Sequence, residues 1–351
     1  MAYSINSFPG RVINIKGDAH LYFGGTAYLG LQTDAEFQEM FIKNVKRYGT
    51  NYGASRKSNV QVDIFDKAEA YLADLVGCPK ALTLSSGYLA GQLISQTFRN
   101  KKHPLFYAPN THAALYQTET KTYTTFTALN IAVREQLSTA KQSEPPVVFL
   151  DAIDFSGCNH PDFEALRTLP LGELILVVDD SHGIGIVGEN GGGVYKTLRA
   201  LQPKELVVCC SLGKGFAIQA GAIFATQRRI DLLKATAFFG GASPASPAAM
   251  ATLLDAHDLY AKKRRLLREN IDYFTKGLVH KKKFHFMPDH PAFTFSDVQL
   301  SEYLEAHHIV VTNFAYPDED SQIMSRIVLS AAHEKKDIDH LLNCINVLPK
   351  I

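Results

Sequence analysis

Short apolar runs recur along the first two thirds of the chain, and amphipathic helical patterns separate them. Five runs have this character: ALTLS at 81, PVVFL at 146, LILVV at 174, LVVCC at 206 and GAIFA at 221. Their length and β-branched content are typical of strands covered on both faces. A helix is expected directly before the first run, at residues 64–76, and Gly77 ends it. Alternating strands and helices predict an α/β fold with a mostly parallel sheet.

The pattern changes after Thr226. Glycines and prolines between residues 240 and 247 interrupt the chain, a long charged helical stretch runs to about Lys276, and the later segments alternate between strands and helices. We therefore expect three parts: residues 1–45 as an N-terminal segment that packs on the other domains, residues 46–235 as the large domain, and residues 236–351 as a smaller C-terminal α+β domain.

Composition and charge narrow the classes of function. The 36 Lys and Arg residues balance 35 Asp and Glu residues, so no overall field favours nucleic acid or an anionic membrane. The five cysteines form neither a disulfide framework nor a paired C-x-x-C metal motif. The first residues lack a signal peptide, and no segment approaches the roughly 18 apolar residues of a membrane span. These features predict a cytoplasmic protein without a metal site.

Gly183, Gly185 and Gly188 have the G-x-G-x-x-G spacing of a dinucleotide-binding turn. Such a turn joins a strand directly to a helix, so that the pyrophosphate meets the helix N-terminus. Here four polar residues precede the first glycine, and residues 191–193 are three more glycines, which begin a helix poorly. A phosphate-binding P-loop fails as well, because glycine follows Lys214 where that motif requires Ser or Thr. The glycines therefore do not predict a nucleotide site.

Asp179 ends one predicted strand, and Lys214 follows the end of the next. The carboxyl ends of parallel strands share one edge of a sheet, where ligand sites form. A carboxylate and a primary amine at that edge suit pyridoxal 5′-phosphate (PLP). The amine forms a Schiff base with the PLP aldehyde, while the carboxylate keeps the ring nitrogen protonated so that the ring accepts carbanion electrons. The two residues predict a PLP site.

The segment DDSHGIG, followed by SLGKGF with Lys214, resembles the fold-type I PLP-dependent enzymes and, among them, the α-oxoamine synthase family. The resemblance continues in chain order through AYLGL at 27, SSGYLA at 85, NTHAALY at 110 and RIVLSAAHEKKDIDHLL at 326. It implies a homodimer whose subunits have a large and a small domain. It also implies a reaction that condenses a small amino acid with an acyl-CoA through a Lys214 aldimine and a ring-stabilised carbanion, as in 8-amino-7-oxononanoate synthase of biotin biosynthesis.

The resemblance also implies roles for single residues. It makes Lys214 the Schiff-base lysine and Asp179 the partner of the ring nitrogen. His182 would hydrogen-bond the phenolic oxygen of PLP, His112 would stack on its ring, and Ser211 would bind its phosphate.

Five further residues have a structural alternative beside the functional one. Ser86, Gly87 and Tyr88 open a predicted helix, so their backbone N–H groups suit a phosphate. The alternative is a strand–helix connection in which Ser86 is only the N-cap, and both roles can hold together. Arg326 matches the arginine that holds the substrate carboxylate, whereas a surface arginine is the alternative. Ser243 lies near the position that supplies a hydroxyl to the neighbouring subunit's phosphate, and a turn residue is the alternative.

The chain departs from the family on the acyl and substrate side. Thr26 and Ala27 stand where the family has Asn and Asp, Lys57 replaces a leucine, Met324 replaces an arginine, and residues 153–158 differ from the family's segment. The cofactor therefore has stronger support than the thioester. An aminotransferase or lyase that does not use CoA is the alternative enzyme. A non-catalytic subunit with the PLP fold is the other alternative, and the presence of Lys214 together with Asp179 argues against it.

Overall fold

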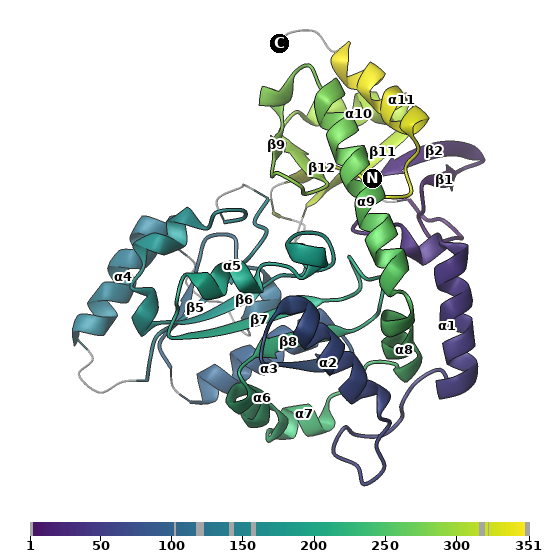
Figure 1. Ribbon diagram of the computed structural model, residues 1–351. Coiled ribbons are helices and arrows are strands. Elements are labelled where there is room, and N and C mark those ends of the chain that lie inside the picture. Colours follow the sequence, from purple (N-terminus) through teal and green to yellow (C-terminus); the bar gives the residue numbers. More distant parts are fainter. Residues whose placement is uncertain are drawn as a thin grey trace. The chain divides into compact units, whose positions relative to one another are not determined.

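The computed structural model describes residues 3–101, 103–116, 123–139, 144–155, 159–315, 320–321 and 323–347. The chain forms two compact units (Figure 1). The large unit comprises Glu39–Asp154 and Cys158–Ala256, and the small unit comprises Met1–Gln38, Phe155–Gly157 and His257–Ile351.

These boundaries differ from the expected ones at two places. The N-terminal residues belong to the small unit, because their strands extend its sheet. Residues 236–256 belong to the large unit rather than to a C-terminal domain, since helix α8 (Pro247–Asp255) packs on helix α2 (Ile64–Val76). The change in the sequence pattern after Thr226 therefore precedes the structural boundary by about thirty residues.

The large unit contains a six-stranded sheet in the order β3-β8-β7-β6-β5-β4. The strands are β3 (Lys80–Leu84), β4 (Leu105–Tyr107), β5 (Val147–Asp151), β6 (Ile175–Asp179), β7 (Glu205–Ser211) and β8 (Gly221–Ala225). Strand β8 is antiparallel to both of its neighbours, and the other three pairings are parallel. The expected α/β fold with a mostly parallel sheet is confirmed, and the five apolar runs are five of these six strands.

Helices cover this sheet. Besides α2 and α8, the large unit contains α3 (Gly87–Asn100), α4 (Phe126–Thr139), α5 (Tyr195–Ala200), α6 (Gln227–Lys234) and α7 (Ala237–Gly241), while α1 (Ala35–Tyr48) begins in the small unit and continues in the large one. Helix α2 has the bounds that the apolar pattern predicts.

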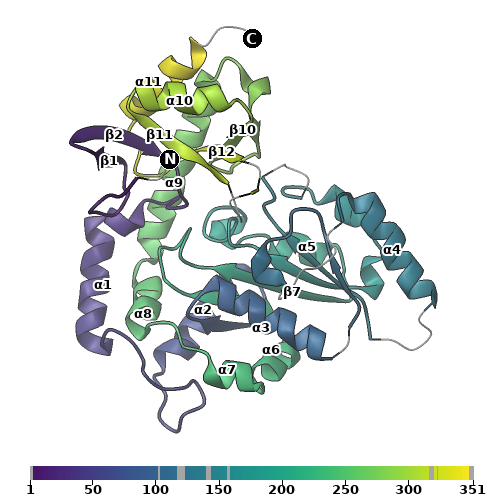
Figure 2. The same ribbon diagram turned by 180° about the vertical axis from the view of Figure 1, so that it is seen from behind.

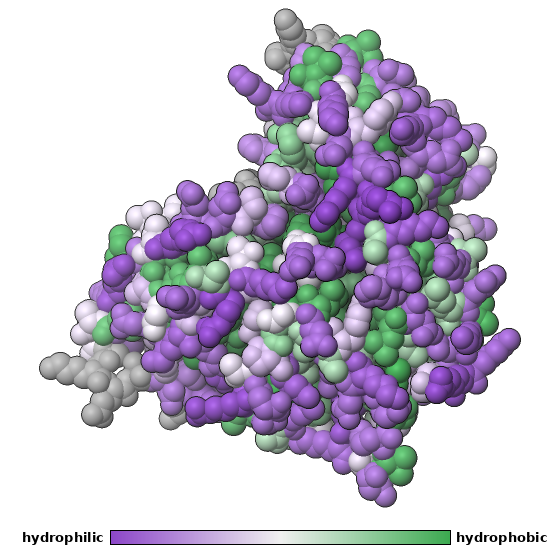
Figure 3. All heavy atoms as spheres, in the orientation of Figure 1, coloured by the Kyte–Doolittle hydropathy of each residue, from purple (hydrophilic) through white to green (hydrophobic). Residues whose placement is uncertain are grey.

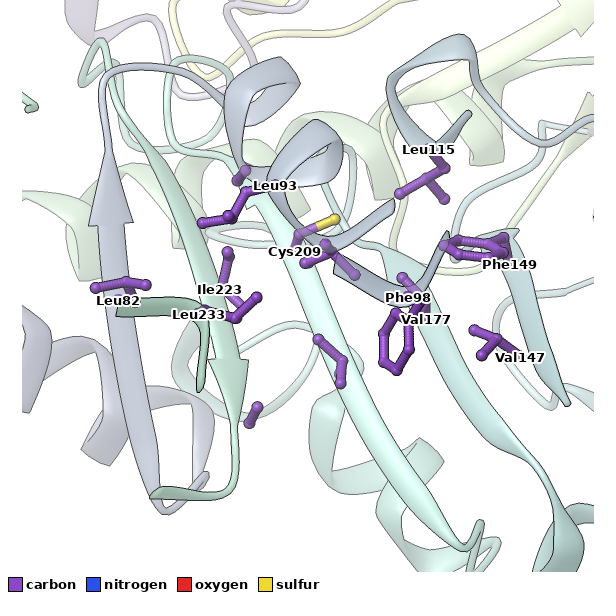
Figure 4. Close-up of a cluster of buried hydrophobic side chains, with 14 of the residues drawn as sticks. Leu82, Leu93, Phe98, Leu115, Val147, Phe149, Val177, Cys209, Ile223 and Leu233 are labelled. Carbon is purple, nitrogen blue, oxygen red and sulfur yellow. The ribbon is translucent and has the colours of Figure 1, made fainter. Parts of the chain in front are cut away.

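The core of the large unit explains why the strands read as continuous apolar runs. Leu93 and Phe98 of α3 and Leu233 of α6 belong to the same buried cluster as Val177 and Cys209 of the sheet (Figure 4). The alternate strand residues, which point to the other face, are buried as well: Val148, Leu150, Leu176, Val178, Val208 and Phe224. Both faces are therefore withdrawn from water, as in other parallel sheets.

The small unit is built on a second six-stranded sheet, in the order β1-β2-β11-β12-β10-β9. Its strands are β1 (Val12–Ile15), β2 (Asp18–Phe23), β9 (His285–Phe286), β10 (Ala292–Phe295), β11 (Ile309–Ala315) and β12 (Ile323–Val328). Its helices are α9 (His257–Gly277), α10 (Val298–Ala306) and α11 (Lys335–Asn346). Strand β2 pairs with β11 in parallel, and the other pairings are antiparallel (Figure 2).

Short 3-10 helices connect these elements: η1 (Leu31–Thr33), η2 (Ala113–Leu115), η3 (Glu164–Thr168), η4 (Leu171–Glu173), η5 (Glu189–Gly191) and η6 (Lys281–Lys283). Polar residues cover most of the face shown in Figure 3, and hydrophobic residues form small patches between them. Within the described part of the chain, every helix is too short or too polar to cross a membrane.

Candidate active site

The carboxyl ends of the parallel strands meet at one edge of the large sheet, and polar residues gather there. Asp151 ends β5, Asp179 ends β6 and Ser211 ends β7. A pocket opens at this edge. Seven residues predicted from the sequence line it: Gly87, Tyr88, His112, Asp179, His182, Ser211 and Lys214. Residues far apart in the chain converge there because β4, β5, β6 and β7 are parallel neighbours, and β3, which lies beyond the antiparallel β8, runs in the same direction as they do.

Three other predicted residues do not line this pocket. Ser86 lies directly before Gly87, as the N-cap of α3. Ser243 is exposed in the large unit, and its backbone carbonyl accepts a hydrogen bond of 3.2 Å from the N–H of Ser85. Arg326 lies in β12 of the small unit.

Lys214 and His182 contact each other in the pocket. The Nζ atom of Lys214 lies 2.8 Å from Nε2 of His182. Lys214 follows β7 and His182 follows β6, and both side chains are half-buried. A lysine ammonium group only donates hydrogen bonds, so a protonated Lys214 requires Nε2 to accept. In that state His182 is neutral and carries its proton on Nδ1.

His112 is held in one orientation by two backbone contacts. Its Nδ1 accepts a hydrogen bond of 3.0 Å from the backbone N–H of Ala114, and the backbone N–H of His112 donates a hydrogen bond of 3.2 Å to Oδ1 of Asp151. Burial lowers the pKa of His112; the charge of Asp179 opposes this shift, and the charge of Lys214 adds to it. The result is a neutral, fixed imidazole, which is suited to stacking rather than to carrying charge.

Two carboxyl groups lie side by side at the sheet edge. Asp151 and Asp179 are register partners in the parallel pair β5–β6. Asp179 is 8% exposed, and its Oδ1 accepts a hydrogen bond of 2.8 Å from the N–H of Ser181. Burial raises the pKa of Asp151 well above its usual range, and repulsion from Asp179 raises it further. A positive charge in the pocket would relieve this repulsion.

Two polar residues of the pocket, Asp151 and Ser181, are not among those predicted from the sequence. Asp151 directly follows the apolar run PVVFL, which is the position that Asp179 occupies after the next run, so the signal was present. Ser181, two residues after Asp179, carries no such signal. Its Oγ accepts a hydrogen bond of 2.8 Å from the N–H of Ser211, and this bond ties the end of β7 to the loop after β6.

The glycines after β6 have a packing reason. Asp180 is 1% exposed, and its Oδ2 accepts a hydrogen bond of 3.0 Å from the N–H of Val194. A Cβ on Gly183 would lie 2.1 Å from Oδ1 of Asp180, and a Cβ on Gly193 would lie 2.0 Å from Oδ2. The loop therefore closes around a buried carboxyl group. The next helix, α5, begins only after this loop, which is unlike the strand–turn–helix junction of a dinucleotide site.

The N-terminus of α3 lies against the ends of two strands. Oγ of Ser86 accepts a hydrogen bond of 3.1 Å from the N–H of Leu89, so the N-cap role is confirmed. A Cβ on Gly87 would lie 2.7 Å from the backbone of Ser211, and one on Gly221 would lie 2.1 Å from the carbonyl oxygen of Ser86. This close approach brings a helix N-terminus to the pocket, where backbone N–H groups and the helix dipole favour an anion.

The sequence has relatives among known proteins. Residues 27–345 match the family model described as aminotransferase class I and II. The 8-amino-7-oxononanoate synthase of Buchnera aphidicola subsp. Baizongia pistaciae is 26% identical, over 95% of this chain and 90% of its own. That of Erwinia tasmaniensis is 27% identical, over 96% and 91%.

Solved structures share the fold. A serine palmitoyltransferase from Sphingomonas wittichii has a TM-score of 0.77 at 18% identity, and the comparison covers 95% of this chain and 88% of that one. The 8-amino-7-oxononanoate synthase of Francisella tularensis has a TM-score of 0.68 at 19% identity, over 93% and 96%. The family match spans most of the sequence, so this chain belongs to the aminotransferase class I and II family.

Proposed function

We propose that this chain is a PLP-dependent transferase that joins a small amino acid to the acyl group of an acyl-CoA thioester. One observation carries the proposal: the Lys214 amine, the Asp179 carboxylate and the neutral His112 imidazole line a single pocket at the carboxyl edge of the sheet. The α-oxoamine synthase reaction is supported by the relatives named 8-amino-7-oxononanoate synthase.

The chemistry of the pocket fits PLP. Lys214 supplies the amine for the PLP aldehyde, and Asp179 supplies the carboxylate for its ring nitrogen. Gly87, at the N-terminus of α3, and Ser211 supply donors for its phosphate. A cationic ring also suits the paired carboxyl groups, because it offsets the repulsion that raises the pKa of Asp151. When bound, PLP supplies an electron-withdrawing ring that stabilises negative charge on the α-carbon of an amino acid.

The surrounding residues orient and protonate the reacting groups. The N–H of Ser181 fixes the carboxylate of Asp179, so that it faces the pocket with little freedom to rotate. His112 presents a flat, uncharged ring. The separation of 2.8 Å between Lys214 and His182 lets a proton pass between Nζ and Nε2, so Lys214 is suited to remove and return the proton of the substrate α-carbon.

The acyl donor needs a test of its own, because the departures from the family lie on that side. The aminotransferase reaction is the alternative, and it requires the same lysine but no thioester. The two reactions differ in their products. A synthase releases free CoA thiol and requires both substrates, whereas an aminotransferase converts an amino acid to a keto acid without CoA.

The test uses the purified full-length chain reconstituted with PLP. Glycine, L-alanine and L-serine are each combined with acyl-CoA thioesters of increasing chain length, and released thiol and keto acid are measured. We expect thiol release that depends on one amino acid, one acyl-CoA and Lys214. Lys214→Ala should abolish it, while Lys204→Ala, a change of an exposed lysine in the same unit, should leave it intact. Keto-acid formation without thiol release would establish the alternative instead.

A further inference from the structure

Arg326 lies against the face of an aromatic ring in the small unit. Its guanidinium carbon is 3.6 Å from the centroid of the Phe155 ring. The corresponding distance from Arg56 to Phe65 in the large unit is 4.2 Å. Arg326 also stands on a central strand, since β12 pairs with β10 and β11 on its two sides. The backbone beneath this arginine is therefore held by two neighbouring strands.

Phe155 is itself held in place by several contacts. Its backbone φ is +56°, a left-handed conformation that bulky side chains rarely adopt. Oγ1 of Thr294 donates a hydrogen bond of 3.4 Å to its carbonyl oxygen. The ring of His290, which is fully buried, meets Phe155 edge-on at 5.8 Å between centroids, and it meets Tyr28 edge-on at 5.7 Å. A left-handed backbone at a bulky residue costs free energy and persists only where surrounding contacts fix it.

Stacking has a specific consequence for a guanidinium group. The aromatic ring covers the face of the planar group, whereas the N–H donors point outward in the plane. That is the direction in which a carboxylate accepts paired hydrogen bonds, and the ring limits the other orientations of the long side chain. Preorganisation of this kind increases affinity because less side-chain freedom is lost on binding.

We infer that Phe155 is a positioning residue, whose ring orients the Arg326 guanidinium to bind the carboxylate of the amino-acid substrate. This inference rests on the proposed function, to which it adds the role in substrate binding that the resemblance implies for Arg326. It adds a second residue, which does not touch the substrate, and it predicts that the aromatic face rather than the bulk of Phe155 matters.

The first test needs no cofactor. The apoprotein is treated with phenylglyoxal, and the modification rate of Arg326 is followed by peptide mass spectrometry. Phe155→Leu keeps an apolar side chain but removes the aromatic face, so Arg326 should react several times faster. Phe155→Tyr keeps the face and should restore the slow rate. Equal rates in all three proteins would overturn the stacking role.

The second test compares two amines on the PLP-loaded protein by the absorption band of the bound cofactor. L-Alanine carries a carboxylate, and ethylamine does not. Phe155→Leu should weaken L-alanine binding by about fivefold to tenfold, in the range of a cation–π contact. Ethylamine binding should stay unchanged, and Phe155→Tyr should bind L-alanine within about twofold of wild type.

The outcomes separate the two proposals. Equal losses for both amines, no loss for either, or wild-type protein without a preference for L-alanine would overturn the role of Phe155 while leaving PLP use intact. Wild-type protein that takes up no PLP would overturn the proposed function and the inference together. Thermal unfolding of each variant shows whether a loss of L-alanine binding reflects misfolding. If Phe155→Leu misfolds, the comparison of Phe155→Tyr with wild type decides whether the aromatic face is sufficient.

Discussion

Gly87→Ala sets two physical effects against each other at the phosphate end of the proposed site. Alanine in place of a helical glycine ordinarily stabilises a protein by up to about 1 kcal/mol, because glycine loses more backbone freedom on folding. At this position, however, the new Cβ would lie 2.7 Å from the N, Cα and Cβ atoms of Ser211. These atoms belong to the end of a buried strand and cannot rotate away.

The steric effect should win. Overpacking of this kind costs about 1–3 kcal/mol, so the free energy of unfolding of the apoprotein should fall by up to about 2 kcal/mol after the gain in helix propensity. Relief of the clash requires α3 to move away from Ser211. One lost hydrogen bond to a charged phosphate costs about 1.5–3 kcal/mol, so PLP should bind at least about tenfold more weakly.

The assay is urea unfolding of the apoprotein together with a PLP titration followed by absorbance. Gly172→Ala is the matched control, because no atom lies within 4 Å of its new Cβ and its backbone φ is not left-handed. Its free energy of unfolding should change by less than about 0.5 kcal/mol. A Gly87→Ala protein as stable as wild type, with unchanged PLP affinity, would refute both the close contact and the phosphate assignment.

The remaining predictions concern the proposed PLP site. Borohydride reduction should fix PLP to the wild-type protein but not to Lys214→Ala, as measured by mass. Asp179→Asn should retain PLP but exchange the α-protons of glycine about a hundredfold more slowly in deuterated water, as followed by NMR. Normal exchange would contradict the role of Asp179. The raised pKa of Asp151 means that the folded state holds this proton more tightly than the unfolded state, so the carboxylate opposes folding at neutral pH and this cost fades as the pH falls through the folded pKa. Asp151→Asn should therefore stabilise the apoprotein in urea at pH 7, with a gain that shrinks toward acid, and a gain independent of pH would contradict this reasoning. Light scattering should show a homodimer, in which Ser243→Ala weakens PLP binding a few-fold without changing the mass; a monomer with full PLP affinity would contradict the contact with the neighbouring subunit.

The large sheet was predictable because each long strand is buried on both faces and therefore stands out as an apolar run. Strand β4 was missed since Leu105–Tyr107 is only three residues long, which is too short for any periodicity to show. The N-terminal strands were missed for a different reason. β2 (Asp18–Phe23) is only partly buried, and its place in the small sheet depends on a parallel pairing with β11, almost three hundred residues later. No local pattern carries that information.

The residues of the site also fall into those that the sequence could predict and those that it could not. Strand ends and side-chain chemistry led to Asp179 and Lys214 without any structure, because both follow apolar runs at one edge of the sheet. Asp151 had the same signal but was not recognised. The purpose of Gly183 and Gly193 was inaccessible, since it depends on the distance from each glycine to one buried carboxyl group. Local sequence shows that such glycines are unusual, while only tertiary packing shows what they approach.

The two consecutive aspartates after the apolar run show how one sequence motif serves two ends. Successive residues at the end of a strand point in different directions, so Asp179 lines the pocket while Asp180 turns into the loop behind it. Burial raises the pKa of Asp180 well above its usual range, which favours the neutral acid at neutral pH. Asp180 accepts the N–H of Val194 and fills the loop, and its raised pKa disfavours a further negative charge behind Asp151 and Asp179. The glycine-rich loop thus supports this edge of the sheet from behind by packing, and the proposed contact with the cofactor belongs to the first aspartate.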